Sequence, residues 1–192
     1  MNRILILQGH PNKDSLVSAL ASAYYAAARE EHEAELVHLI DLNFSWNLPK
    51  GYKDLREVEL EEDLQMMQEK IARATHLVWA YPNWWGTMPA LTKGFIDRTF
   101  LPGFAFKYRD GGLPERLLKG KSARLLVTMD TPVWWYKFVV GAPGHKAMKR
   151  AILQFCGISP VKITTFAVVR KASEQKIEHW LQKAALLGRK GA

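Results

Sequence analysis

The sequence predicts an α/β fold in which helices cover both faces of a five-stranded parallel sheet, with strand order 2-1-3-4-5. Short apolar runs alternate with longer segments of helical spacing along the chain, a pattern typical of parallel sheets with right-handed crossovers. No internal repeat and no linker interrupts this alternation. At 192 residues the chain suits one domain, residues 1–192, built as a three-layer sandwich.

The first part of the chain opens with a buried strand, expected from Arg3 to Leu7, and a polar turn that cannot continue it. Apolar residues at helical spacing begin at Leu16, and Asp14 or Ser15 is placed to cap that helix. The free N–H groups of the helix would then point at the end of the first strand, where an anion such as a phosphate binds well. A second strand is expected from Glu35 to Leu39.

The next segment is charged and predicts a second helix. The inward side of this helix would be formed by Leu60, Leu64, Met67 and Ile71. An acidic cluster from Glu57 to Asp63 stands near its start, where the helix dipole favours negative charge. We interpret the cluster as a solvated face.

The stretch from His76 to Tyr108 is the most informative. An apolar run from His76 to Tyr81 has the length of a buried parallel strand and ends at Pro82, and a helix is expected from Pro89. The loop between them holds Asn83, Trp84, Trp85 and Gly86. Such a loop, at the carboxyl end of a parallel strand, offers flat apolar faces and free backbone groups to a planar heteroaromatic ligand.

The second half of the chain continues the alternation. A short helical piece is expected from Leu113 to Leu118, and a fourth strand from Ser122 to Thr128. A second aromatic group follows in a segment expected to be a loop, and it comprises Trp134, Trp135 and Tyr136. The next expected helix runs from His145 to Phe155, with Met148, Ile152 and Phe155 inward. A fifth strand is expected from Lys162 to Val169, followed by a last helix capped by Ser173.

The expected strand order makes the first, third and fourth strands neighbours. The loops that follow these three strands therefore converge on one crevice at the carboxyl edge of the sheet. The sequence thus predicts one site with an anion-binding helix end and aromatic walls.

Composition narrows the choice of partner. The formal net charge of +8 invites a nucleic-acid interpretation, but the basic residues are scattered and form no run. Anionic small molecules are therefore the favoured partners, and nucleic acid is not. No apolar run is long enough for membrane insertion, so we expect a cytoplasmic protein, and the lone Cys156 is expected to be a buried structural residue.

Several catalytic motifs are missing from the sequence. Gly120-Lys121-Ser122 lacks the earlier glycine of a phosphate-binding P-loop and precedes a strand, and no G-x-G-x-x-G follows the first strand. No histidine has partners at zinc spacing and no serine sits in a nucleophile elbow, so we expect no metal site and no hydrolase. A site made of backbone groups and aromatic walls suits a cofactor that carries its own chemistry.

Three segments carry a resemblance to a known family. The densest is Y-P-N-W-W-G-T-M-P-A-L-T-K-G-F-I-D-R-T-F-L-P-G-F-A-F at residues 81–106, and the others are His10 to Leu16 and Phe155-Cys156-Gly157. Together they resemble the NAD(P)H:quinone oxidoreductase family of flavodoxin-like flavoproteins, of the bacterial quinone reductase or modulator of drug activity type. The resemblance spans essentially the whole chain.

The resemblance implies a flavin site. His10, Ser15 and Leu16 would hold the flavin phosphate, and the ring would lie against Pro82, Asn83, Trp84 and Trp85. The third wall would be formed by Thr128, Met129, Asp130 and Thr131, where the family usually reads Thr-Thr-Gly-Gly. The long C-terminal extension of the mammalian members is absent, which favours FMN, with FAD as the alternative.

The resemblance also implies an activity. NAD(P)H as electron donor and a quinone or related flat electrophile would take turns at one site of a homodimer, in a two-electron ping-pong cycle. Tyr136 and His145 would relay a proton or contact the acceptor, and Trp134 and Trp135 would cover the acceptor pocket or pack against a second subunit. The alternatives are a nitro- or azo-compound reductase, or a flavin-binding regulatory subunit of a potassium efflux system.

Overall fold

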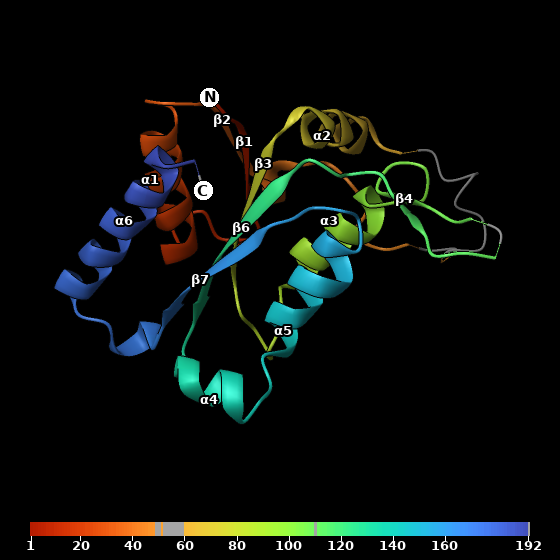
Figure 1. Cartoon of the computed structure of the whole chain (residues 1–192). Helices are drawn as coiled ribbons and strands as arrows, with labels where there is room; N and C mark the ends of the chain where they lie inside the picture. The colour runs from red at the N-terminus through yellow and green to blue at the C-terminus, as the bar shows by residue number, and fades with distance from the viewer. Residues whose placement is uncertain (49–50, 52–59, 110, 192) are drawn as a thin grey trace.

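The computed structural model describes residues 1–48, 51, 60–109 and 111–191, and its main feature is a parallel sheet (Figure 1). The sheet has the order β2-β1-β3-β6-β7, which confirms the predicted order 2-1-3-4-5. Its strands are β1 (Arg3–Gln8), β2 (Glu33–His38), β3 (His76–Pro82), β6 (Ser122–Met129) and β7 (Val161–Ala167). All four neighbouring pairs are parallel.

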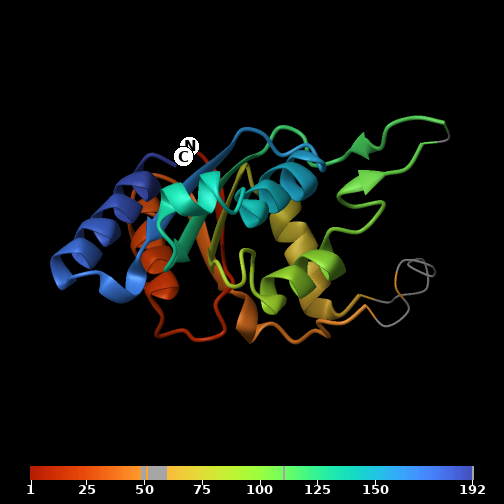
Figure 2. The same cartoon turned by 90° about the horizontal axis from the view of Figure 1, so that it is seen from below.

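Helices cover both faces of this sheet, as Figures 1 and 2 show. One face carries α1 (Leu16–Ala28) and α6 (Glu174–Arg189), and the other carries α2 (Glu62–Arg73), α3 (Ala90–Thr99) and η2 (Ala147–Gln154). Successive strand side chains point to opposite faces, so Ile4 and Ile6 join the core under α1 whereas Leu5 and Leu7 join the core on the other side. The predicted three-layer architecture is confirmed.

The predicted helix caps are confirmed. Ser15 accepts a hydrogen bond at Oγ from the Ser18 backbone N–H at 3.3 Å, and Ser173 does the same for Lys176 at 3.3 Å. The side chains that α2 buries are Leu64, Met67 and Ile71, while Leu60 precedes the helix and is half-buried. Residues 57–59 of the predicted acidic cluster lie outside the described residues.

Two elements differ from the prediction. Residues 113–118 form no helix, because Glu115 and Arg116 (β5) pair with Phe106 and Lys107 (β4) in a small antiparallel ribbon. The leucine spacing of that segment is misleading, since Leu113 is exposed and only Leu118 is buried. The second aromatic segment is not a plain loop: it contains the short helices α4 (Val133–Phe138) and α5 (Pro143–Lys146), joined through a left-handed Ala142.

The helix expected from His145 to Phe155 continues from α5 into η2, which has the wider π-helical winding. Because residues five apart share a face of such a helix, Met148 and Leu153 point inward. Ile152 and Phe155 pack against the same core while half-buried. Short 3₁₀ turns follow β2 (η1, Leu39–Asp41) and β7 (η3, Val169–Lys171). No described helix is long and apolar enough to cross a bilayer.

Acid stability depends on His76, which lies at the start of β3. Its side chain is buried against Ser122, with Nδ1 and Oγ 2.7 Å apart, and burial together with Arg124, Lys162 and His32 lowers its pKa to about 4. The unfolded chain therefore takes up a proton at this residue between about pH 6.5 and pH 4, and stability falls across that window as pH falls. We expect this residue alone to account for about 3 kcal/mol of the loss at pH 4.

Urea unfolding at pH 7 and pH 4 measures the effect. The difference in unfolding free energy between the two pH values should shrink in His76→Gln and should stay unchanged in His179→Gln, which alters an exposed histidine of α6. A His76→Gln protein with the pH dependence of the native chain would contradict the assignment.

Candidate functional site

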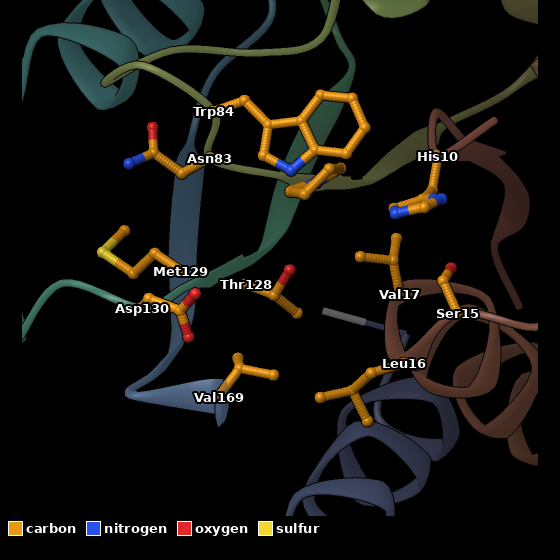
Figure 3. Close-up of a pocket in the computed structure, with 11 residues that line it drawn as sticks. His10, Ser15, Leu16, Val17, Asn83, Trp84, Thr128, Met129, Asp130 and Val169 are labelled. Carbon is orange, nitrogen blue, oxygen red and sulfur yellow. The ribbon is translucent and has the colours of Figure 1, made fainter. Parts of the chain in front are cut away.

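A cavity of about 210 Å³ lies at the carboxyl ends of β1, β3 and β6 (Figure 3). Its lining residues are His10, Ser15, Leu16, Val17, Pro82, Asn83, Trp84, Thr128, Met129, Asp130 and Val169. All but two of the predicted cofactor residues therefore meet at one place, as the strand order requires. The exceptions are Trp85 and Thr131, and the residues that the sequence did not indicate are Val17 and Val169.

The first wall is the loop from β1 into α1. Because the first N–H groups of a helix have no partner within the helix, those at Leu16 and Val17 can serve a ligand in the cavity. His10 Nδ1 accepts a hydrogen bond from the Asn12 backbone N–H at 2.9 Å, so a neutral His10 carries its proton on Nε2 as a donor. Burial lowers the pKa of His10, so the ring is neutral at pH 7. Its Nε2–H and the N–H groups of Leu16 and Val17 are the donors that this wall can offer to an anion.

The turn after β3 supplies the second wall and separates its two tryptophans. Trp84 and Thr87 exchange backbone hydrogen bonds of 2.9 and 3.0 Å, which places Trp85 and Gly86 at the corner with φ of 50° and 82°. These angles are those of a tight type I′ turn, whose corner residues project from the end of the hairpin. Trp84 consequently faces the cavity with its ring 5.3 Å from that of His10, while Trp85 is fully exposed, which corrects its predicted place in the wall.

The third wall depends on a contact between two segments far apart in the sequence. The Asp130 carboxylate accepts a hydrogen bond from the Arg170 backbone N–H at 2.8 Å and forms an ion pair with the Arg170 guanidinium, with Nε and Oδ2 2.9 Å apart. This pairing brings Val169 to the cavity beside Asp130, as Figure 3 shows. The residue before Val169 is Val168, whose backbone is left-handed with φ of 63°. Among the described residues that line the cavity Asp130 is the one carboxylate, and the positive charge of Arg170 balances its negative charge.

Val169 was part of the predicted fifth strand, so its role at the cavity was missed. The strand ends at Ala167, and no local pattern signals the left-handed Val168, since β-branched residues rarely adopt that conformation. Thr131 lies one residue beyond the wall, just before α4.

Tyr136 and His145 lie beneath the tryptophan turn and do not line the cavity. The Tyr136 hydroxyl donates to the Gly86 carbonyl at 2.8 Å and accepts from the Gly144 N–H at 3.0 Å, and the two rings are 4.9 Å apart. Burial raises the pKa of Tyr136 and lowers that of His145 to about 4, so both are neutral at pH 7. Tyr136 braces the turn that carries Trp84, and His145 packs against the Tyr136 ring. The predicted proton relay stays a prediction.

A sequence profile of the flavodoxin-like fold family matches residues 2–186. The chain belongs to this flavodoxin-like family. The flavodoxin-like chain is also 27% identical to an uncharacterized NAD(P)H oxidoreductase of Haemophilus influenzae, over 96% of this chain and 93% of the relative.

Two further relatives are informative. An FMN-dependent NADH:quinone oxidoreductase of Bacillus cereus is 28% identical over 64% of this flavodoxin-like chain and 67% of its own. The solved structure of Smu.1420 from Streptococcus mutans superposes with a TM-score of 0.82 and 33% identity, over 97% of this chain and 98% of that one.

The chemistry available to this flavodoxin-like site is binding and orientation. The lone Cys156 is buried, which raises its pKa to about 12 and leaves it a thiol at pH 7. The cavity walls present anion donors at one end and an aromatic face at the other. These features fit a ligand that has a phosphate at one end and a planar ring at the other.

Proposed function

We propose that this protein is an FMN-dependent NAD(P)H oxidoreductase that reduces quinones or related flat electrophiles by two electrons. The observation that carries this proposal is the joining of an anion-binding helix end and the aromatic face of Trp84 in one cavity. The relatives of Haemophilus influenzae and Bacillus cereus support it, because their names give NAD(P)H oxidoreductase and FMN-dependent NADH:quinone oxidoreductase activities.

The residues of the cavity fit FMN in a definite orientation. His10, Ser15 and the N–H groups of Leu16 and Val17 would hold the phosphate, because they are the donors gathered at the α1 end of the cavity. The ring would lie between the second and third walls, from Pro82 to Trp84 and from Thr128 to Asp130. Bound FMN supplies the two-electron redox chemistry, and the protein positions the flavin and its partners.

A homodimer is part of the proposal. The cavity of about 210 Å³ is smaller than the roughly 300–1,000 Å³ of typical small-molecule pockets, so a second subunit would complete the site. An apolar groove of about 300 Å³ runs between α3, η2 and the β4 strand and offers an interface. The groove is lined by Lys93, Ile96, Asp97, Phe100, Phe106, Tyr108, Ala151, Ile152, Phe155 and Cys156.

Ala151→Glu tests the proposed interface without touching the core. Ala151 is exposed in the single chain, so a charge there should leave the subunit folded but oppose burial at the groove. We expect sedimentation to give a dimer for the native protein and a monomer for the variant. A native protein that sediments as a monomer at micromolar concentration would contradict the proposed dimer.

The two neighbouring tryptophans provide a matched pair of variants. Trp84→Ala removes an aromatic wall and should weaken FMN binding roughly tenfold, the order expected for one lost stacking contact. Trp85→Ala should leave the affinity within about twofold, because the side chain is fully exposed and lies outside the cavity. Titration of FMN fluorescence measures both affinities, and an equal effect of the two substitutions would argue against the described wall.

Steady-state kinetics test the proposed catalytic cycle. If donor and acceptor use the same face of the flavin in turn, double-reciprocal plots at several quinone concentrations should give parallel lines. Intersecting lines would show that both substrates are bound together and would rule out the single shared site.

A further inference from the structure

A continuous chain of hydrogen bonds connects the inside of the sheet to the first wall of the cavity. Gln8, the last residue of β1, has no solvent exposure and lies behind the wall without lining the cavity. Its amide Nε2 donates to Ser18 Oγ at 2.8 Å, and its amide oxygen accepts from His38 Nδ1 at 3.3 Å. Ser18 in turn lies next to Ser15, with the two hydroxyl oxygens 3.2 Å apart.

The direction of this chain decides what Ser15 offers to a ligand. Ser18 Oγ accepts from Gln8, so its own hydrogen is directed to its two other neighbours, the Ser15 Oγ at 3.2 Å and the Asn12 carbonyl at 3.3 Å. When the Ser18 hydroxyl donates to Ser15, the Ser15 oxygen accepts from both the N–H and the hydroxyl of Ser18, and the Ser15 hydrogen is free to turn into the cavity. With this polarity Ser15 faces a bound anion as a donor.

The orientation of the Gln8 amide is therefore decisive. The amide oxygen of Gln8 can only accept, so in the described orientation His38 Nδ1 carries the proton and donates to that oxygen, and the NH₂ group is left toward Ser18. If an acceptor stood in place of the NH₂ group, Ser18 would give its hydrogen to that acceptor and no longer to Ser15. Ser15 would then donate to Ser18 instead of to a ligand. The resulting loop would present lone pairs to an anion.

We propose that Gln8 is a positioning residue for the phosphate of the bound flavin, acting through Ser18 to direct the Ser15 hydroxyl into the cavity. The inference rests on the proposed function and deepens it. It assigns to a fully buried residue outside the cavity a share of the selectivity for a phosphorylated flavin over an unphosphorylated one.

Riboflavin, which has the same ring without the phosphate, is the matched control ligand. In Gln8→Met the donor to Ser18 is lost, and we expect the dissociation constant for FMN to rise about tenfold while that for riboflavin changes less than about twofold. In Gln8→Glu at pH 8 the carboxylate accepts from Ser18 and reverses the chain, so the loss for FMN should be larger still. Fluorescence titration of both flavins against each variant gives the four constants.

Ser18→Ala repeats the test with a small residue that suits a helix, should Gln8 variants fail to fold. It should show a smaller selective loss of FMN affinity, because Ser15 loses the donor that directs its hydroxyl but no competing acceptor remains. Equal weakening of FMN and riboflavin, or no change in either, would overturn the inference while leaving the proposed function intact. A native protein that binds neither flavin would overturn the proposed function and this inference together.

Discussion

Gly144→Ala is expected to lower the free energy of unfolding by about 3 kcal/mol and to release the turn that carries Trp84. A Cβ at this position would lie 2.5 Å from the Gly86 carbonyl oxygen, 2.8 Å from the Thr87 Cα and 3.0 Å from the Tyr136 hydroxyl. Two of these contacts are backbone atoms that cannot rotate away. The hydrogen bonds from the Gly144 N–H to Gly86 and Tyr136 would be lost with the shift.

Urea unfolding and FMN titration together measure this prediction. We expect reduced stability and weaker FMN binding in the same variant, because the brace beneath the turn and the second wall are one structure. Gly112→Ala is the control, since a Cβ there would meet no atom within 4 Å. A Gly144→Ala protein as stable as the control would show that α5 does not pack against the turn as described.

Gly188→Ala is expected to have a larger effect on stability, about 4 kcal/mol. Replacing glycine by alanine inside a helix normally stabilises it by about 1 kcal/mol. Here the added Cβ would lie 2.1 Å from the Tyr24 carbonyl oxygen and 2.9 Å from the Tyr24 carbonyl carbon, so α6 must move away from α1. The sign of the usual effect is therefore reversed.

Thermal and urea unfolding test this second prediction. Lys183→Ala, on an exposed position of α6, should stay within about 0.5 kcal/mol of the native protein. Since α1 carries Ser15 at its N-terminus, displacement of α6 should also weaken FMN binding. Unchanged or increased stability of Gly188→Ala would contradict the close α1–α6 packing.

The fold was predictable because its signals are local. The buried strands β1, β3 and β6 appear as short apolar runs, and both serine caps are marked by residue type at the correct spacing. The errors arose where the structure of a segment depends on residues outside that segment. The β4–β5 ribbon joins Phe106 to Arg116, and nothing in the leucine-containing segment itself indicates that partner.

The position of the site was also predictable, since the strand order alone brings three loops together. The details within those loops were not. Trp84 and Trp85 are identical neighbours, and only the backbone angles of the turn decide which one faces the cavity. In the same way, the contact of Asp130 with Arg170 depends on a left-handed Val168 that no sequence rule favours.

Anaerobic reduction of the FMN-loaded protein tests the central claim most directly. NADH or NADPH should bleach the yellow colour of the bound flavin, and one equivalent of a quinone should restore it. A purified protein that retains no FMN, or that holds FMN but does not speed its bleaching by either nicotinamide, would contradict the proposed oxidoreductase.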